Sequence, residues 1–316
     1  SYVNAFNTFG IASYLSLDDE KNWEKMINNK VKKNVEIFDI KHFGKRLMLY
    51  STVVGSLMII CFPMLYIVLA SFKSGADLSA VPPTLFPTEW TYGNYVELFR
   101  QSDFVTYFKN SVILAIIATA LSIILGAVGA YSLSRFPFRP IQIFGSISLL
   151  SYMLPEVLIV IPLYVYVVNL GLHDTITSLV LANICFTLPL TLWFMKSYFN
   201  AIPIALEESA MIDGNTRFQA FRKVTLPLAL PGLVSVGIFS FNHTWNEFIF
   251  ALIFISSDKK NVLPLAVAKW MAQDTIHDWG IMIAASVLII IPTLVFYLII
   301  QKKLISGMAA GGVKGG

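Results

Sequence analysis

The sequence has few charged residues and almost no cysteine. Only 13% of its 316 residues are Asp, Glu, Lys or Arg, against roughly 25% in an average soluble domain, whereas 56% are hydrophobic and the mean hydropathy is +0.68. The two cysteines, Cys61 and Cys185, lie in separate apolar segments, so we expect small buried thiols rather than a disulfide or a metal site. This composition excludes an ordinary soluble domain and predicts a protein that crosses a membrane several times.

Several chemical motifs are also missing. The chain holds no Gly-x-x-x-x-Gly-Lys-Ser/Thr phosphate loop, no His and Cys cluster with metal-ligand spacing, and no nucleophile beside a base. We therefore expect a chain that is not an enzyme and that binds neither a metal nor a cofactor of its own. The net charge of +4 requires no nucleic-acid partner, and the first residues lack the basic and apolar regions of a cleavable signal peptide.

Long apolar segments dominate the rest of the chain. Each is long enough for a helix of roughly 20 residues, the length that crosses the hydrocarbon core, and they predict six transmembrane helices at 47–72, 111–133, 141–168, 178–199, 228–255 and 280–300. Pro155 and Pro162 predict a bent or broken third span, and Gly126 and Gly129 predict close helix packing in the second. The expected fold class is an all-α membrane protein.

The basic residues predict the orientation of these spans. With the N-terminus in the cytoplasm, 17 of the 23 Lys and Arg residues fall in cytoplasmic segments and only six in the outside loops. This asymmetry is typical of membrane proteins, whose cytoplasmic loops are enriched in Lys and Arg. It predicts that both termini and the polar stretch between the fourth and fifth spans are cytoplasmic.

That polar stretch, residues 203–227, carries the signals of an ordered hairpin. Pro203 suits a helix start, and Gly214 suits a left-handed residue at a helix end. Thr216 with Gln219 is the pattern of a capping box for a second short helix, which we expect Pro227 to end. The stretch is therefore predicted to form a helix, a glycine turn and a helix.

The same stretch resembles the EAA loop of ABC importer permeases. In that family the pattern is Glu-Ala-Ala, three residues, Gly, nine residues and Ile-x-Leu-Pro. Here Glu208 begins the pattern and Gly214 has the required spacing. Ser209 stands where the family has Ala, and Val224 where it has Ile, and both are mild departures. The resemblance implies a coupling helix that docks on a cytoplasmic ATPase. The expected coupling residues are Glu207, Glu208, Ser209, Ala210, Asp213, Gly214, Leu226 and Pro227.

Residues 45–316 further resemble carbohydrate-importer permeases of the maltose-transporter G-subunit type. The similar stretches are 90–95, 135–139, Trp245-Asn246-Glu247-Phe248 and the Gly-rich tail from Leu304. The resemblance implies the type I ABC importer permease fold, alternating access, and a tail in which Gly311, Gly312 and Lys314 reach the ATPase. It also implies a bacterial or archaeal plasma membrane, a second homologous permease, two ATPase subunits that bind ATP and Mg²⁺, and an extracytoplasmic binding protein.

Polar residues inside the expected spans have two interpretations. Charge at the bilayer centre is costly, so such groups face a protein interior or a wet path. Trp245, Asn246 and Glu247 in the fifth span either line the translocation path or form a structural hydrogen-bond network. Glu156 lines a wet bent helix or joins a network to a partner chain, and Asn183 is a candidate of the same kind.

Three regions follow from this reading: a polar cytoplasmic extension at 1–44, a permease domain at 45–305 with its coupling loop at 200–227, and a cytoplasmic tail at 306–316. The extension is either merely solvated or a regulatory segment. The expected function is the passage of a sugar or oligosaccharide. The same machine with another cargo, such as a glycerol phosphate ester, and a secondary transporter that needs no ATPase remain as alternatives.

Overall fold

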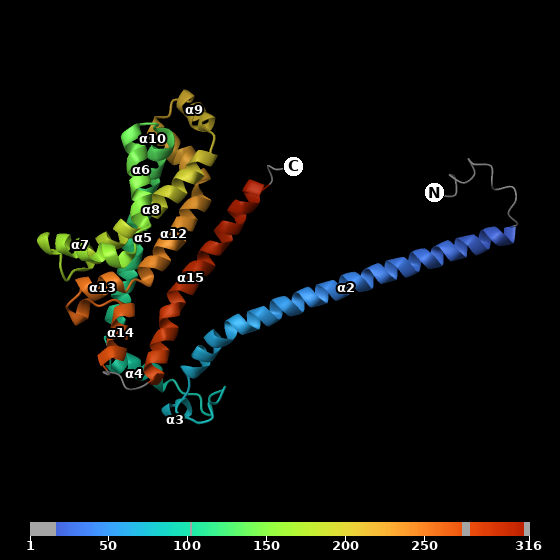
Figure 1. Ribbon diagram of the computed structural model, residues 1–316, viewed down its shortest axis with the longest axis horizontal. Helices are drawn as coiled ribbons and strands as arrows, with labels where there is room; N and C mark the ends of the chain where they lie inside the picture. The colour runs from blue at the N-terminus through green and yellow to red at the C-terminus, as the bar shows by residue number, and fades with distance from the viewer. Residues whose placement is uncertain (1–16, 102, 274–278, 313–316) are drawn as a thin grey trace. The chain divides into compact units, whose positions relative to one another are not determined.

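The computed structural model describes residues 17–101, 103–273 and 279–312, and almost all of their regular structure is helical (Figure 1). The chain divides into two compact units, Ser1–Tyr66 and Ile67–Gly316. The first unit holds most of α2 (Leu17–Ala70), whose part from Lys45 is apolar enough to cross a membrane.

The second unit is a bundle of helices joined by short connections. In chain order they are α3 (Gly75–Leu78), α4 (Gly93–Gln101), α5 (Phe104–Arg135), α6 (Arg139–Tyr152), α7 (Glu156–Asn169), α8 (Ile176–Ala201), α9 (Ile204–Ile212), α10 (Arg217–Ala220), the π-helix η2 (Phe221–Thr225), α11 (Leu226–Leu228), α12 (Leu230–Trp245), α13 (Ile249–Phe254), the 3₁₀ turn η3 (Asp258–Lys260), α14 (Leu263–Gln273) and α15 (Trp279–Gly312). Within the described residues, four helices are long and apolar enough to span a membrane, or up to six if each bent pair is one span.

The third expected span is broken, as its prolines predicted. Helices α6 and α7 meet at an angle of 112°, and Pro155 is the N-cap residue directly before α7. Because proline has no N–H and fixes its own φ, it is best tolerated at the start of a helix. Pro162, the second proline of this span, lies inside α7. The bend therefore separates two shorter apolar helices.

The fifth expected span is also interrupted, which the sequence analysis did not predict. Instead of one helix over 228–255, α12 ends at Trp245 and α13 begins at Ile249, so Glu247 lies in the break and not midway along a span. Pro227 also does not end the preceding helix; it lies in the first turn of α11, where proline is tolerated, and the 74° bend follows at Ala229.

Both cysteines are exposed on the surface of this chain, contrary to the expectation of buried thiols. An apolar segment of a membrane protein can face lipid or another chain, so its hydrophobicity alone does not indicate burial within the fold.

The core is built where α5 packs against α8 and α12. Gly126 and Gly129 of α5 lie so close to α8 that an added Cβ would come within 2.2 Å of the Thr191 Cγ2 and 2.6 Å of the Leu192 Cδ2. Beside them the Ser122 and Thr187 hydroxyls hydrogen-bond across the two helices at 2.7 Å. The predicted close packing of the second span is confirmed.

A network of polar contacts surrounds Asp174 in the connection between α7 and α8. The Asp174 carboxylate accepts hydrogen bonds from the Ser257 hydroxyl at 2.6 Å and the Ser256 backbone N–H at 3.1 Å, and it pairs with Lys260 at 2.9 Å. The hydrogen bonds from Ser257 are the main reason that the pKa of Asp174 lies well below its usual range. This residue therefore ties the α7–α8 connection to the segment after α13.

The contact at Gly126 gives a first prediction. Replacing Gly126 by Ala should lower the free energy of unfolding by about 1–3 kcal/mol, the usual cost of overpacking a tight contact, because Thr191 is fully buried and has little room to move. Thermal unfolding of the purified protein in detergent measures the effect.

Two further variants control this experiment. The change Gly55→Ala adds the same group where nothing lies within 4 Å, so it should leave stability unchanged or raise it. Adding Thr191→Ser to Gly126→Ala removes the clashing Cγ2 and should recover part of the loss. Equal stability of the two glycine variants would contradict the tight packing of α5 on α8.

Candidate functional site

The segment 203–228 forms the hairpin that its sequence predicted. Pro203 is the N-cap residue directly before α9, and Gly214 adopts a φ of +88° in the turn after this helix. The Asn215 N–H returns to the Ala210 carbonyl at 3.1 Å, as in a Schellman turn. The Thr216 and Gln219 capping box is present at the start of α10. We call residues 203–228 the coupling segment.

The coupling segment exposes most of its expected functional residues. The exposed ones are Glu208, Ser209, Asp213, Gly214 and Pro227, whereas Ala210 and Leu226 are half-buried. Two large apolar side chains beside them, Ile212 and Phe218, are 86% and 68% exposed. A polar surface with prominent apolar side chains is suited to docking on another protein.

Glu207 differs from its neighbour Glu208 because its carboxylate is turned into the protein. The residue is only 4% exposed, and its two oxygens accept hydrogen bonds from Arg135 Nε and from the Tyr131 hydroxyl, both at 2.8 Å. Burial alone disfavours the charged carboxylate, but these donors outweigh it, so the pKa of Glu207 is lowered. Glu207 is therefore buried as a charged group.

Arg135 and Tyr131 were missed by the sequence analysis. They stand one helical turn apart at the end of α5, and their side chains share one face. A Tyr and an Arg at that spacing, just where an apolar span ends, were the signal available in the sequence. Nothing local indicated that their partner lies in α9.

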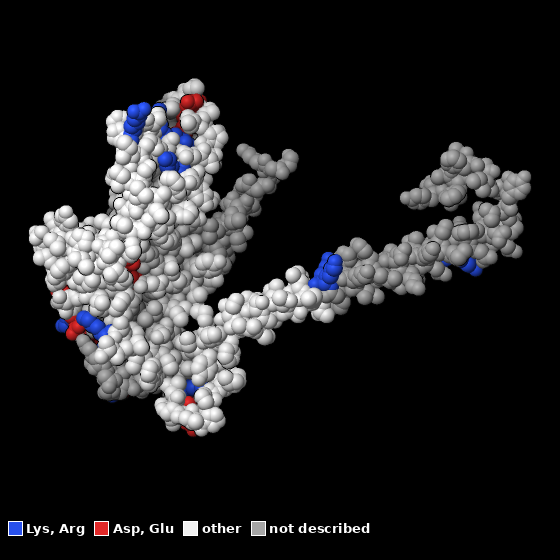
Figure 2. All heavy atoms as spheres, in the orientation of Figure 1, with Lys and Arg blue, Asp and Glu red and all other residues white. Residues whose placement is uncertain are grey.

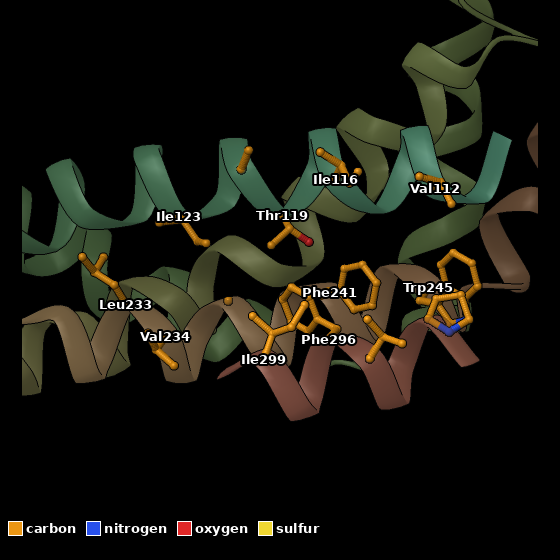
Figure 3. A pocket seen from close by; sticks show the side chains of 14 residues that line it. Val112, Ile116, Thr119, Ile123, Leu233, Val234, Phe241, Trp245, Phe296 and Ile299 are labelled. Atoms are coloured by element: carbon orange, nitrogen blue, oxygen red, sulfur yellow. The ribbon is translucent and has the colours of Figure 1, made fainter. Parts of the chain in front are cut away.

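Trp245 faces an apolar cavity in the other half of the bundle (Figure 3). The cavity has a volume of about 660 Å³ and is lined by α5, α12 and α15. Trp245 itself is 2% exposed, donates from Nε1 to the Ile289 carbonyl at 3.1 Å and stacks on Phe241. Its surroundings are therefore apolar and packed.

Asn246 and Glu247 follow Trp245 but have different surroundings. Asn246 is exposed, and its amide donates to the Asn242 carbonyl at 2.8 Å. Glu247 is 4% exposed, and its carboxylate accepts from the backbone N–H groups of Phe250 and Ala251 in the first turn of α13. An anion at a helix N-terminus satisfies free N–H groups and is stabilised by the helix dipole.

The remaining two path candidates lie in α7 and α8. Glu156 is half-buried in the first turn of α7. Asn183 of α8 is fully buried; its amide donates to the Leu179 carbonyl at 2.9 Å, and its Oδ1 has no hydrogen-bond partner in the described part of the chain. None of the hydrogen bonds found among the described residues joins one of the five candidates to another.

The expected tail residues are only partly described. Gly311 and Gly312 are the last residues of α15, and Lys314 lies outside the described residues. No group of three or more His, Cys, Asp or Glu side chains that could hold a metal ion occurs among the described residues.

Figure 2 shows where charge lies on one face of the second unit: Lys and Arg side chains gather at the end that carries α6, α9 and α10, and the apolar middle is almost free of charge. Charged ends around an apolar middle are typical of a protein that crosses a bilayer. The coupling segment thus lies at a charged end of the bundle.

This arrangement of helices matches that of ABC importers. A chain in the crystal structure of a bacterial ABC transporter involved in the import of the acidic polysaccharide alginate aligns with a TM-score of 0.68 at 23% sequence identity, covering 81% of this chain and 95% of that one. At this level of identity the likeness shows the fold alone.

Sequence comparison then gives the family. Residues 119–308 match the family described as the binding-protein-dependent transport system inner membrane component, and the chain belongs to this family. It is 37% identical to the inner membrane ABC transporter permease protein YcjP of Escherichia coli (strain K12), over 82% of this chain and 93% of the relative. It is 33% identical to the trehalose/maltose transport system permease protein MalG of Thermococcus litoralis, over 86% and 98%. The chain is therefore a multi-pass membrane permease of an ABC transporter.

The geometry of Glu247 gives a second prediction. The change Glu247→Leu leaves two buried N–H groups without their acceptor, and it should lower the free energy of unfolding by about 1–3 kcal/mol for each group left unsatisfied. The change Glu247→Gln keeps a side-chain oxygen and should cost less. Thermal unfolding of the purified protein compares the two, and the same loss in both variants would contradict the capping role.

Proposed function

We propose that this chain is the permease subunit of an ATP-driven importer that takes up a sugar or an oligosaccharide delivered by an extracytoplasmic binding protein. The observation that carries the proposal is the coupling segment. It combines the spacing of the importer loop with an ordered glycine turn and an exposed face at Glu208, Ser209 and Ile212. Such a face needs a protein partner, and the family makes an ATPase the natural one.

The proposal includes a topology and a set of partners. Six spans place both termini and the coupling segment in the cytoplasm of a bacterial or archaeal cell, consistent with the distribution of Lys and Arg. Two ATPase subunits bind ATP and Mg²⁺ and dock on the coupling segment. A second, homologous permease completes the membrane part, and Gly311, Gly312 and Lys314 of the tail reach the ATPases.

The cargo is proposed from the relatives. One is named for trehalose and maltose, and another, 34% identical over 86% of this chain, for trehalose. Trp245 and Glu247 are held in structural contacts, whereas Asn246 is exposed and Asn183 keeps an unused buried acceptor. Asn246 and Asn183 are therefore the better candidates for contact with a sugar hydroxyl. Glu156, half-buried at the bend between α6 and α7, is the third.

Isolation of the assembly from native membranes in mild detergent tests the proposal. Mass spectrometry of the eluate should find an ATPase, a second permease and a binding protein. Liposomes containing the complex and the binding protein should take up radiolabelled trehalose or maltose only with internal ATP. Recovery of this chain alone, active in liposomes without ATP, would establish the secondary transporter instead. ATP-driven uptake of glycerol phosphate, but not of sugars, would change the cargo.

Gly214 gives a third prediction. The change Gly214→Val puts a β-branched residue at a φ of +88° and should distort the turn, so that ATPase activity stimulated by the loaded binding protein falls. The change Gly214→Asn is the matched control, since Asn tolerates left-handed backbone and no atom within 4 Å would meet the added Cβ. Full stimulation in the Val variant of the assembled complex would contradict a role of this turn in coupling.

A further inference from the structure

The contact between α5 and α9 is an ion pair removed from water. The Arg135 and Glu207 side chains are each only 5% exposed, and the guanidinium approaches one carboxylate oxygen with both Nε and Nη2, at 2.8 Å each. The other carboxylate oxygen accepts a hydrogen bond from the Tyr131 hydroxyl. Both carboxylate oxygens are therefore held from α5, in one orientation.

Arg135 also holds the connection that leads into α9. Its Nη2 donates to the Ile202 carbonyl at 3.1 Å, between α8 and α9. Its Nη1 donates to the Ser134 hydroxyl, which itself donates to Asn200 near the end of α8 at 2.6 Å. One guanidinium thus joins the end of α5 to the α8–α9 connection and to α9 itself.

Aromatic packing supports the same junction from η2. The Tyr131 ring lies 4.5 Å from the Phe221 ring and 6.0 Å from the Phe199 ring, measured between centroids. Arg217 of α10 lies over the Phe136 ring just after α5, at 5.2 Å from its centroid. The helices α9, α10 and η2 of the coupling segment are therefore each in contact with the end of α5 or with the residue that follows it.

A buried ion pair is a specific way to make such a junction. Apolar side chains of similar size hold helices together at least as well, because charges lose their hydration when they are buried. What the fork of an arginine adds is direction, since its planar donors fix the carboxylate in position and angle. The Arg135–Glu207 pair thus restricts how α9 can turn or slide against α5.

We propose that Arg135 and Glu207 are positioning residues for energy coupling: their buried pair fixes α9 on the end of α5, so that a displacement of α9 by the ATPase moves α5 with it. This inference rests on the proposed function. Its consequence within the membrane follows from packing, because α5 lies against α8 at Gly126 and lines the cavity shared with α12 and α15.

Uncoupling of transport from hydrolysis is the expected effect of breaking the pair. The variants Arg135→Gln and Glu207→Gln each remove one charge. In liposomes with the full complex and its binding protein, both should lower the amount of radiolabelled trehalose or maltose taken up per ATP hydrolysed by about fivefold or more, the lower end of couplings between linked sites. The double variant should lose no more than the worse single variant, since both act through one contact.

A matched control distinguishes the pair from general damage. Arg139→Gln removes an exposed arginine at the same end of the bundle and should leave the uptake ratio unchanged. A merely structural role of the pair would lower the yield of assembled complex, whereas the uptake ratio of the complex that does assemble would stay at the wild-type value. That result, or an unchanged ratio in both single variants, would overturn the proposal.

A second measurement uses the intact pair and does not depend on how well the variants fold. Spin labels are placed on Val128→Cys of α5 and Ile204→Cys of α9, both exposed positions, after Cys61→Ser and Cys185→Ser. The distance between the labels should be the same without nucleotide and with bound ATP. A shift on ATP binding would overturn the proposal. If the wild-type complex isolated from membranes contained no ATPase, the proposed function itself would be refuted. Failure of the positioning role and failure of the proposed function therefore give different results.

Discussion

Hydrocarbon offers no hydrogen bonds, and each break in the helices of this chain has to satisfy its own backbone groups from within the protein. The break after α12 uses the Glu247 carboxylate for two N–H groups of α13. The bend before α7 uses Pro155, which has no N–H to satisfy. Helix ends in this fold are therefore where its polar side chains matter most.

Helix geometry explains why two adjacent glutamates have opposite environments. Residues 207 and 208 follow one another on α9, and successive residues of a helix point about 100° apart. Glu207 thus meets Arg135 of α5 inside the fold, while Glu208 stays exposed. The inner residue joins the coupling segment to the membrane helices, and the outer one remains free for a partner. In the proposed coupling, a single turn of helix would carry both the contact with α5 and the contact with the ATPase.

Features with local partners could be predicted from the sequence. The left-handed Gly214, the capping box of Thr216 and Gln219, and the bend at Pro155 each depend on residues within a few positions. The family also followed from such spacing. The Arg135–Glu207 pair could not be predicted, because 72 residues separate its members and no local pattern shows that the two meet. The break at Glu247 was missed for a related reason. Residues 228–255 are mostly apolar and long enough for one span, and only the tertiary fold shows that α12 ends at Trp245 and that the Glu247 carboxylate caps α13.

Neighbours in the sequence need not share a role, as Trp245, Asn246 and Glu247 illustrate. A continuous helix would have placed them on successive faces of one span, with a common surface toward a sugar path. Because α12 ends at Trp245, the indole packs between α12 and α15, the amide folds back on Asn242, and the carboxylate serves α13. Trp245 and Glu247 are therefore held by backbone groups inside the fold, and we expect a substitution at either to affect stability before it affects the binding of cargo.

The apolar cavity beside Trp245 is also a poor site for a sugar. Its lining is almost wholly hydrocarbon, and Thr119 has the one hydroxyl among the lining side chains. The cavity therefore lacks the hydrogen-bond donors and acceptors that a sugar requires. In the proposed function, recognition of a sugar would therefore depend on polar groups elsewhere along these helices and on the surface presented to the proposed second permease.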